Sequence, residues 1–112
     1  QEIIICCAPA PGEKQGEKHP QGEKLDQAAE LIACHKIGAA IGHMHARDER
    51  LLQSVDPTRF RQQCEQIRQS TDLILEGSTG GAPEHTLEQR AVTFTVPLVE
   101  MGSLNLGSVN MY

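Results

Sequence analysis

Short apolar runs alternate with longer amphipathic stretches along this chain, and that alternation limits its fold more than any other feature. The apolar runs predict strands at residues 3–8, 39–46, 73–75 and 98–103. Helical periodicity appears in each interval between them, in the first only after a Pro-, Gly-, Lys- and Glu-rich loop over residues 9–24, so the predicted order is βαβαβαβ. Because consecutive parallel strands need a long crossover, this order predicts an α/β fold with a parallel sheet and right-handed connections.

Capping signals indicate where the three intervening helices begin and end. Gly38 stands where the C-terminal cap of the first helix belongs. Asp56 is a predicted N-cap, and Pro57 occupies the first helical position after it. Thr86 and Gln89 are spaced as a capping box, which predicts a short third helix over residues 87 to about 93.

Two of these helices carry an apolar stripe at the spacing of one helical face. The stripe of the second helix is Phe60, Cys64 and Ile67. The stripe of the first helix comprises Leu25, Ala28, Ala29, Ile32 and Lys36. We therefore expect both helices to pack one side against the sheet.

Two histidines one residue apart, His43 and His45, end the second apolar run. In a strand, positions i and i+2 point to the same side, so both imidazoles would project into one space while Met44 points away. Imidazole nitrogens are good ligands for zinc, which predicts a divalent metal site here. The plainer alternative is a pair of core or surface histidines.

Polar residues cluster after every predicted strand end. These residues are Glu13, His43, His45, residues 78–81, Ser103 and Asn105. A site assembled from successive strand ends is typical of a TIM-type (β/α)8 barrel, of which this chain would supply the first four strands. A doubly wound open sheet also places its ligand at this edge, but near a single switch point. The barrel is therefore the favoured fold.

The third strand runs into Ser78-Thr79-Gly80-Gly81. A hydroxyl beside two glycines lets backbone N–H groups approach an anion, although an ordinary glycine-rich turn reads the same way. Ser103 and Asn105 share one face of the fourth strand, as an anion-site wall or as satisfied core groups. Glu13 could bind a substrate cation or face water, and Glu17 competes for that role.

Composition excludes some partners. A net charge of −5 leaves no basic stripe for nucleic acid, and the apolar stretches fall short of the roughly 20 residues that span a bilayer. We predict no membrane partner. The cysteines (Cys6, Cys7, Cys34 and Cys64) form no Cys-x-x-Cys pair, which indicates buried free thiols in a reducing, cytoplasmic compartment.

Five segments together resemble the β-keto acid cleavage enzyme family, in the family's order and along nearly the whole chain. They are Gly12-Glu13, His43-Met44-His45-Ala46-Arg47-Asp48, Ser78-Thr79-Gly80-Gly81, Leu87-Glu88-Gln89-Arg90 and residues 100–108. Each is weak by itself. The ordered set is specific.

The resemblance implies a zinc-dependent barrel that converts a β-keto acid and acetyl-CoA into acetoacetate and a new acyl-CoA. His43 and His45 would bind the metal, and Ser78, Gly80 and Gly81 would hold the substrate carboxylate. Ser103 and Asn105 would line the same pocket. Glu13 would contact the far end of the keto acid, which gives Glu13 and Ser78 the catalytic roles. Expected partners are the two small substrates and further copies of the chain, as a homo-oligomer.

A complete barrel needs about 250 residues, so residues 1–112 are predicted to be the N-terminal half of one, a fragment of a longer enzyme. The family's third metal ligand, a glutamate, and its proton-transfer arginine and aspartate lie in the second half. Two alternatives stay open. Amidohydrolase-type barrels also use His-x-His, but on their first strand, and a half-barrel could bind metal or anion without catalysis.

Overall fold

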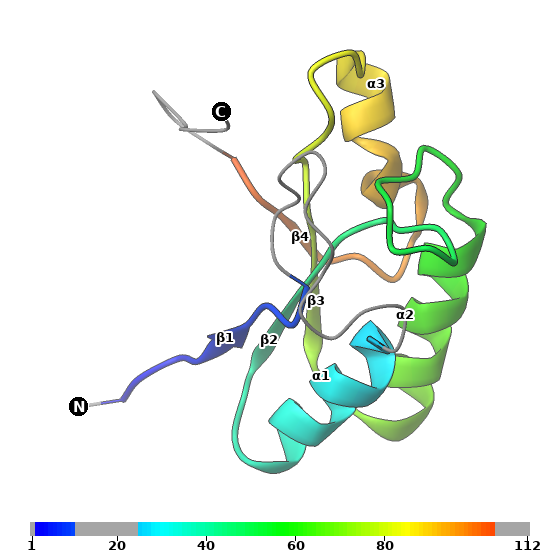
Figure 1. Cartoon of the computed structure of the whole chain (residues 1–112). Coiled ribbons are helices and arrows are strands. Elements are labelled where there is room, and N and C mark those ends of the chain that lie inside the picture. Colours follow the sequence, from blue (N-terminus) through cyan, green and yellow to red (C-terminus); the bar gives the residue numbers. More distant parts are fainter. Residues whose placement is uncertain (1, 11–24, 105–112) are drawn as a thin grey trace.

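The computed structural model describes residues 2–10 and 25–104, and it contains one four-stranded parallel sheet (Figure 1). The strands lie side by side in chain order, each paired with the next. They are β1 (Cys6–Cys7), β2 (Ile41–Met44), β3 (Ile74–Gly77) and β4 (Met101–Gly102). The predicted parallel sheet is confirmed.

The helices follow the strands in the predicted alternation: α1 (Gln27–Lys36), α2 (Thr58–Ser70), α3 (Leu87–Arg90) and the 3-10 helix η2 (Val92–Thr95). Gly38, just after α1, has a φ of +113°, a left-handed conformation that glycine adopts without strain. The Thr86–Gln89 capping box is present at the start of α3. The Asp56 carboxylate accepts from Thr58 N at 2.9 Å, as a cap does, although the helix begins one residue later than predicted.

The helices α1 and α2 cover one face of the sheet (Figure 1). Phe60, Cys64 and Ile67 form the stripe of α2 that was predicted, each at most 1% exposed. They pack into a core that also contains strand residues such as Met44 and Leu75. A doubly wound sheet would carry helices on both faces, whereas a barrel carries them on the outer face alone. The chain is thus an α/β portion of a TIM-type barrel.

The other face of the sheet carries side chains at alternate strand positions, and these are partly or fully exposed. Register pairs Cys6 with Ile41, Ile41 with Ile74, and His43 with Glu76, and paired residues of parallel strands point the same way. The intervening strand residues Gly42, Met44, Leu75 and Gly77 are buried. Chemistry-bearing residues therefore stand on the face opposite the helices.

Two predicted strands are shorter than expected. Residues 3–5 are not a buried strand: Ile3, Ile4 and Ile5 are 82%, 74% and 49% exposed. They precede the first paired residue of β1, and Ile5 alone reaches the start of β2 within the described residues, where its carbonyl accepts from Ala40 N at 2.9 Å and Ile41 N at 3.2 Å. In the predicted strand 98–103, only Met101–Gly102 is strand paired with β3, because Pro97 and Leu98 form a turn before it and β3 ends at Gly77.

The third predicted helix stops at Arg90 and the chain tightens into η2. Packing explains the change, since η2 lies directly on the strand glycines. A Cβ on Gly77 would lie 2.5 Å from Thr93 Oγ1. The backbone of residues 92–95 therefore lies close to the sheet as a 3-10 helix and does not continue the α-helix.

Two further expectations are corrected. In α1 the buried residues are Gln27, Ala28 and Leu31, not Ala29 and Lys36, so the helix is rotated relative to the predicted stripe. All four cysteines are free as expected, but Cys64 alone is buried, and Cys6 is exposed because it lies on the face that no helix covers. In the part of the chain that the structure describes, no helix has the length and apolar character needed to cross a bilayer.

Candidate functional site

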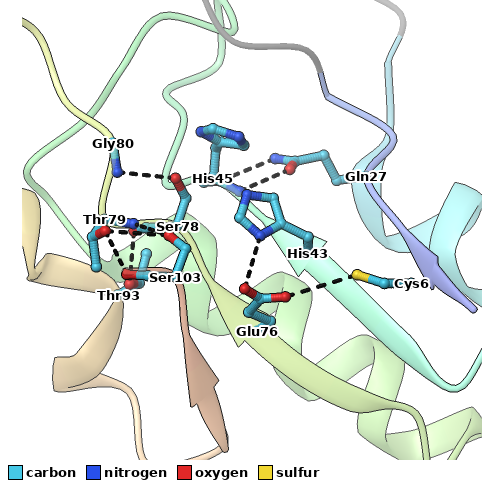
Figure 2. Close-up of polar contacts among 10 residues, drawn as sticks. All are labelled: Cys6, Gln27, His43, His45, Glu76, Ser78, Thr79, Gly80, Thr93 and Ser103. Carbon is cyan, nitrogen blue, oxygen red and sulfur yellow. Dashed lines mark hydrogen bonds and ion pairs between the residues drawn. The ribbon is translucent and has the colours of Figure 1, made fainter. Parts of the chain in front are cut away.

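His43 and His45 meet at the carboxyl end of β2, as their spacing predicted. Their ring centroids lie 5.1 Å apart and the ring planes are inclined at 78° (Figure 2). His43 is in the strand, and His45 lies one residue beyond its last residue, Met44. The two imidazoles share one space above the sheet edge.

His45 has the electrostatics of a neutral metal ligand. Burial lowers its pKa to about 4, with smaller contributions from the positive charge of Arg47 and from His43. Among the described residues, its Nδ1 is buried and has no hydrogen-bond partner. A neutral imidazole with an uncommitted ring nitrogen has a lone pair available for a cation.

Gln27, the first residue of α1, holds the backbone of His45 (Figure 2). Its Nε2 donates to His45 O at 3.1 Å, and its Oε1 accepts from His45 N at 3.2 Å. The glutamine is 1% exposed. Because β2 has already ended, this side chain continues the pairing of the strand by one residue.

Glu76 of β3 stands beside His43. The distance from His43 Nδ1 to Glu76 Oε1 is 3.5 Å, and the two side chains are 19% and 17% exposed. The other carboxylate oxygen, Glu76 Oε2, accepts from Cys6 Sγ at 3.7 Å. Three neighbouring strands thus contribute one polar side chain each to a row on the open face (Figure 2).

The Ser78-Thr79-Gly80-Gly81 turn follows β3 directly and lies at the same sheet edge as the histidines (Figure 2). Ser78 is 6% exposed, and its Oγ accepts from Gly80 N at 3.1 Å. Thr93 of η2 donates to Ser78 O at 3.1 Å. Two hydrogen bonds thus hold the turn, one within it to its own serine and one to the 3-10 helix η2.

Ser103 joins the turn from β4. Its Oγ accepts from Thr79 N at 3.1 Å, and Thr79 Oγ1 donates to Ser103 O at 2.8 Å. Ser78 and Ser103, predicted from separate motifs, are therefore brought together through Thr79. Glu13 and Asn105, also predicted, lie outside the described residues.

A pocket opens between His45 and the turn, and its walls include residues of the loop before α3, of α3 and of η2. These include His45, Ser78, Gly80, His85, Arg90 and Thr93. A Cβ on Gly81 would lie 2.8 Å from Arg90 Cγ, so the glycine admits this arginine. The Arg90 guanidinium donates to the carbonyls of Ala82 and His85, which fixes the loop around the pocket.

The two histidines fit a metal site in part. A buried, unpartnered and neutral nitrogen next to a second imidazole is a suitable pair of zinc ligands. Residues 2–10 and 25–104 contain no group of three His, Cys, Asp or Glu side chains placed to hold a metal ion. A further ligand would have to come from elsewhere in the protein.

Four residues at this site escaped prediction. Glu76 had a signal, since it is a carboxylate placed directly after the apolar run 73–75, between that run and the predicted turn. Thr79 lay inside the predicted turn, but its link to Ser103 depends on strand pairing. Gln27 and His85 carried no local signal, because their partners are set by the tertiary fold.

Comparison with known proteins gives one consistent result. Residues 2–112 match the model of the β-keto acid cleavage enzyme family. A 3,5-dioxohexanoate:acetyl-CoA acetone transferase of Paraburkholderia graminis is 32% identical over 115 residues. A 3-keto-5-aminohexanoate cleavage enzyme of Fusobacterium nucleatum is 34% identical over 114 residues. Both alignments cover 98% of this chain but only 36% and 41% of those proteins. The chain belongs to the β-keto acid cleavage enzyme family.

Proposed function

We propose that the protein containing this chain transfers the acyl group of a β-keto acid to coenzyme A, with acetyl-CoA as the second substrate and zinc as the metal. The keto acid R–CO–CH₂–COO⁻ and acetyl-CoA would give R–CO–CoA and acetoacetate. The observation that carries the proposal is the family match over residues 2–112, with the two predicted ligand histidines side by side.

Two groups of residues in this chain would bind the reacting part of the keto acid, one at its keto oxygen and the other at its carboxylate. His43 and His45 would hold the zinc, which when bound supplies Lewis-acid stabilisation of negative charge on the keto oxygen. The Ser78-Thr79-Gly80-Gly81 turn would hold the carboxylate, with Ser78 as a hydroxyl donor. Fixing both groups orients the carbon between them for loss of its proton.

The turn suits this role because its shape does not depend on the substrate. Thr79, Ser103 and Thr93 hold it to β4 and η2 by hydrogen bonds of 2.8 to 3.1 Å. A donor set held in advance binds charge without the cost of reorganisation. The Ser78 oxygen accepts from Gly80 N, so its own proton would be free to be donated to a carboxylate.

The identity of the group R depends on the residues that face the variable end of the keto acid. The two relatives are named for a dioxo acid and an amino-keto acid, which share the β-keto acid end and differ beyond it. Glu13 is proposed to face this variable end. Partners are then the keto acid and acetyl-CoA, with a homo-oligomeric assembly in the cytoplasm as the proposed setting.

The test uses the whole protein, loaded with zinc and incubated with acetyl-CoA and a panel of β-keto acids. Mass spectrometry should detect acetoacetate and one new acyl-CoA in equal amounts. His43→Ala and His45→Ala should each abolish product and stoichiometric zinc. His35→Ala is the matched control, since His35 contacts Ala39 O and Asp72 at the far end of α1.

Two outcomes would contradict the proposal. Unchanged zinc content in both site variants would remove the metal assignment. Turnover of a substrate without any requirement for acetyl-CoA would favour an amidohydrolase-type reaction instead.

A further inference from the structure

We propose that Glu76 is a positioning residue that fixes the His43 imidazole, so that Nδ1 carries the proton and Nε2 is the nitrogen offered to the metal. The inference rests on the proposed metal role of His43. It adds a residue that acts through a ligand and that neither the family match nor the names of the relatives assign.

The backbone places the two side chains together. His43 and Glu76 are direct register partners on β2 and β3, so their side chains leave the sheet on the same face. The distance between Nδ1 and Oε1 is 3.5 Å, at less than a fifth exposure for either side chain. At this distance the two atoms form an ion-pair contact, and in metal-free sites such contacts are often longer than they are once the site is loaded.

The chemistry of the carboxylate decides the tautomer. An ionised carboxylate only accepts hydrogen bonds, so the ring nitrogen that faces it must be the one that carries the proton. The lone pair of a neutral His43 is then on Nε2. Carboxylates behind metal-binding histidines fix ring orientation in this way and make the ligand more basic.

Cys6 holds the carboxylate in place from its other side. Its Sγ contacts Glu76 Oε2 at 3.7 Å from β1. Partial desolvation, and then the charge of Glu76, raise the pKa of the Cys6 thiol. Each oxygen of Glu76 therefore faces a different neighbour: Oε1 faces the His43 ring and Oε2 faces the Cys6 thiol (Figure 2).

Glu76 has no evident role in holding the fold. Its side chain points away from the helices, while the neighbouring strand residues Leu75 and Gly77 are buried beneath them. The described residues also contain no three-residue metal group that would include it. Its position beside His43 is what a positioning role requires.

The test measures zinc affinity of the whole protein by competition with a chromogenic chelator. Glu76→Met removes the acceptor and should weaken zinc binding about 10- to 100-fold. Glu76→Gln keeps an acceptor oxygen but loses the charge, so its loss should be smaller. The control is Asp72→Asn, which alters another histidine–carboxylate pair, with His35 at 3.1 Å, and should leave the affinity unchanged.

A second readout examines the tautomer itself. In the metal-free protein, ¹⁵N NMR should show His43 protonated on Nδ1, and Glu76→Met should convert it to a mixture of tautomers. If Glu76→Met does not fold, Glu76→Gln carries both measurements. Unchanged affinity together with an unchanged tautomer would overturn the inference.

The outcomes separate this inference from the proposed function. If His43→Ala retains zinc, the metal role of His43 is wrong. If His43→Ala loses zinc while the Glu76 variants bind normally, the proposed function stands and Glu76 is not a positioning residue. Complete loss of zinc in Glu76→Gln with an unchanged tautomer would make Glu76 a direct ligand, which also overturns the positioning role.

Discussion

Replacement of Gln27 by methionine should lower the free energy of unfolding, because it releases the backbone of His45. Methionine matches the length and flexibility of glutamine, so the buried volume is nearly retained. The substitution removes two hydrogen bonds of 3.1 and 3.2 Å, which both join Gln27 to the backbone of His45. Both polar groups of one peptide segment lose their partner at once.

The magnitude follows from what is left behind. An unsatisfied buried donor or acceptor costs about 1–3 kcal/mol. The backbone N–H and C=O of His45 are only partly buried, and water can reach them to some degree. We therefore expect a loss of about 2–4 kcal/mol in the free energy of unfolding, a large share of the stability of an ordinary domain.

Urea denaturation measures this loss, and Gln63→Met provides the control. Gln63 is also a buried helical glutamine, but its Oε1 has no hydrogen-bond partner among the described residues. Its replacement should change the free energy of unfolding by less than about 1 kcal/mol, because fewer interactions are lost. Equal effects of the two substitutions would refute the reasoning, and so would a Gln27→Met variant as stable as the parent.

Three further predictions concern packing, pH and thiol reactivity. Gly42→Ala would place a Cβ 2.8 Å from Leu73 Cδ2 and 3.0 Å from a methyl of Leu31. Urea denaturation should therefore show a loss of about 1–3 kcal/mol in the free energy of unfolding, and an unchanged midpoint would contradict the tight packing. The pKa of His45 is lowered from 6.5 to about 4 in the metal-free fold. As the pH falls below 6.5, the unfolded chain therefore takes up a proton that the folded protein does not, and the free energy of unfolding decreases. Between pH 7 and pH 5 the free energy of unfolding should drop by about 2 kcal/mol through this residue, and a His45→Gln variant with the same pH slope would argue against it. The Cys64 thiol is fully buried, and burial raises its pKa to about 12. A disulfide reagent should therefore modify Cys6 in the folded protein and Cys64 only after unfolding. Equal modification rates for Cys6 and Cys64 would show that the core opens readily.

Local signals predicted the helices well because caps and stripes act within a few residues. The Thr86–Gln89 box and the Phe60, Cys64 and Ile67 stripe both appear as expected. Strand lengths were overestimated, since pairing depends on where the neighbouring strand starts and stops. β1 and β4 lie at the two ends of the described sheet and pair on one side each, so only two residues of each run qualify.

At the site, too, contacts within one strand could be predicted from the sequence, whereas contacts between elements could not. The shared direction of His43 and His45 follows from the period of a strand, and the structure places them together. Gln27 and Glu76 could not be assigned from the sequence, because each reaches its histidine from another element. The metal and the roles of the individual site residues stay predictions.

The alternation along β2 has a consequence for how such a protein acquires new activities. Gly42 and Met44 determine whether the strand fits against the helices, whereas Ile41 and His43 face away from them. Adjacent residues on one strand are thus subject to separate selective pressures. A mutant library confined to His43 and Glu76 would sample new chemistry near the carboxyl end of the sheet while leaving unaltered the sequence of the core between the sheet and the helices.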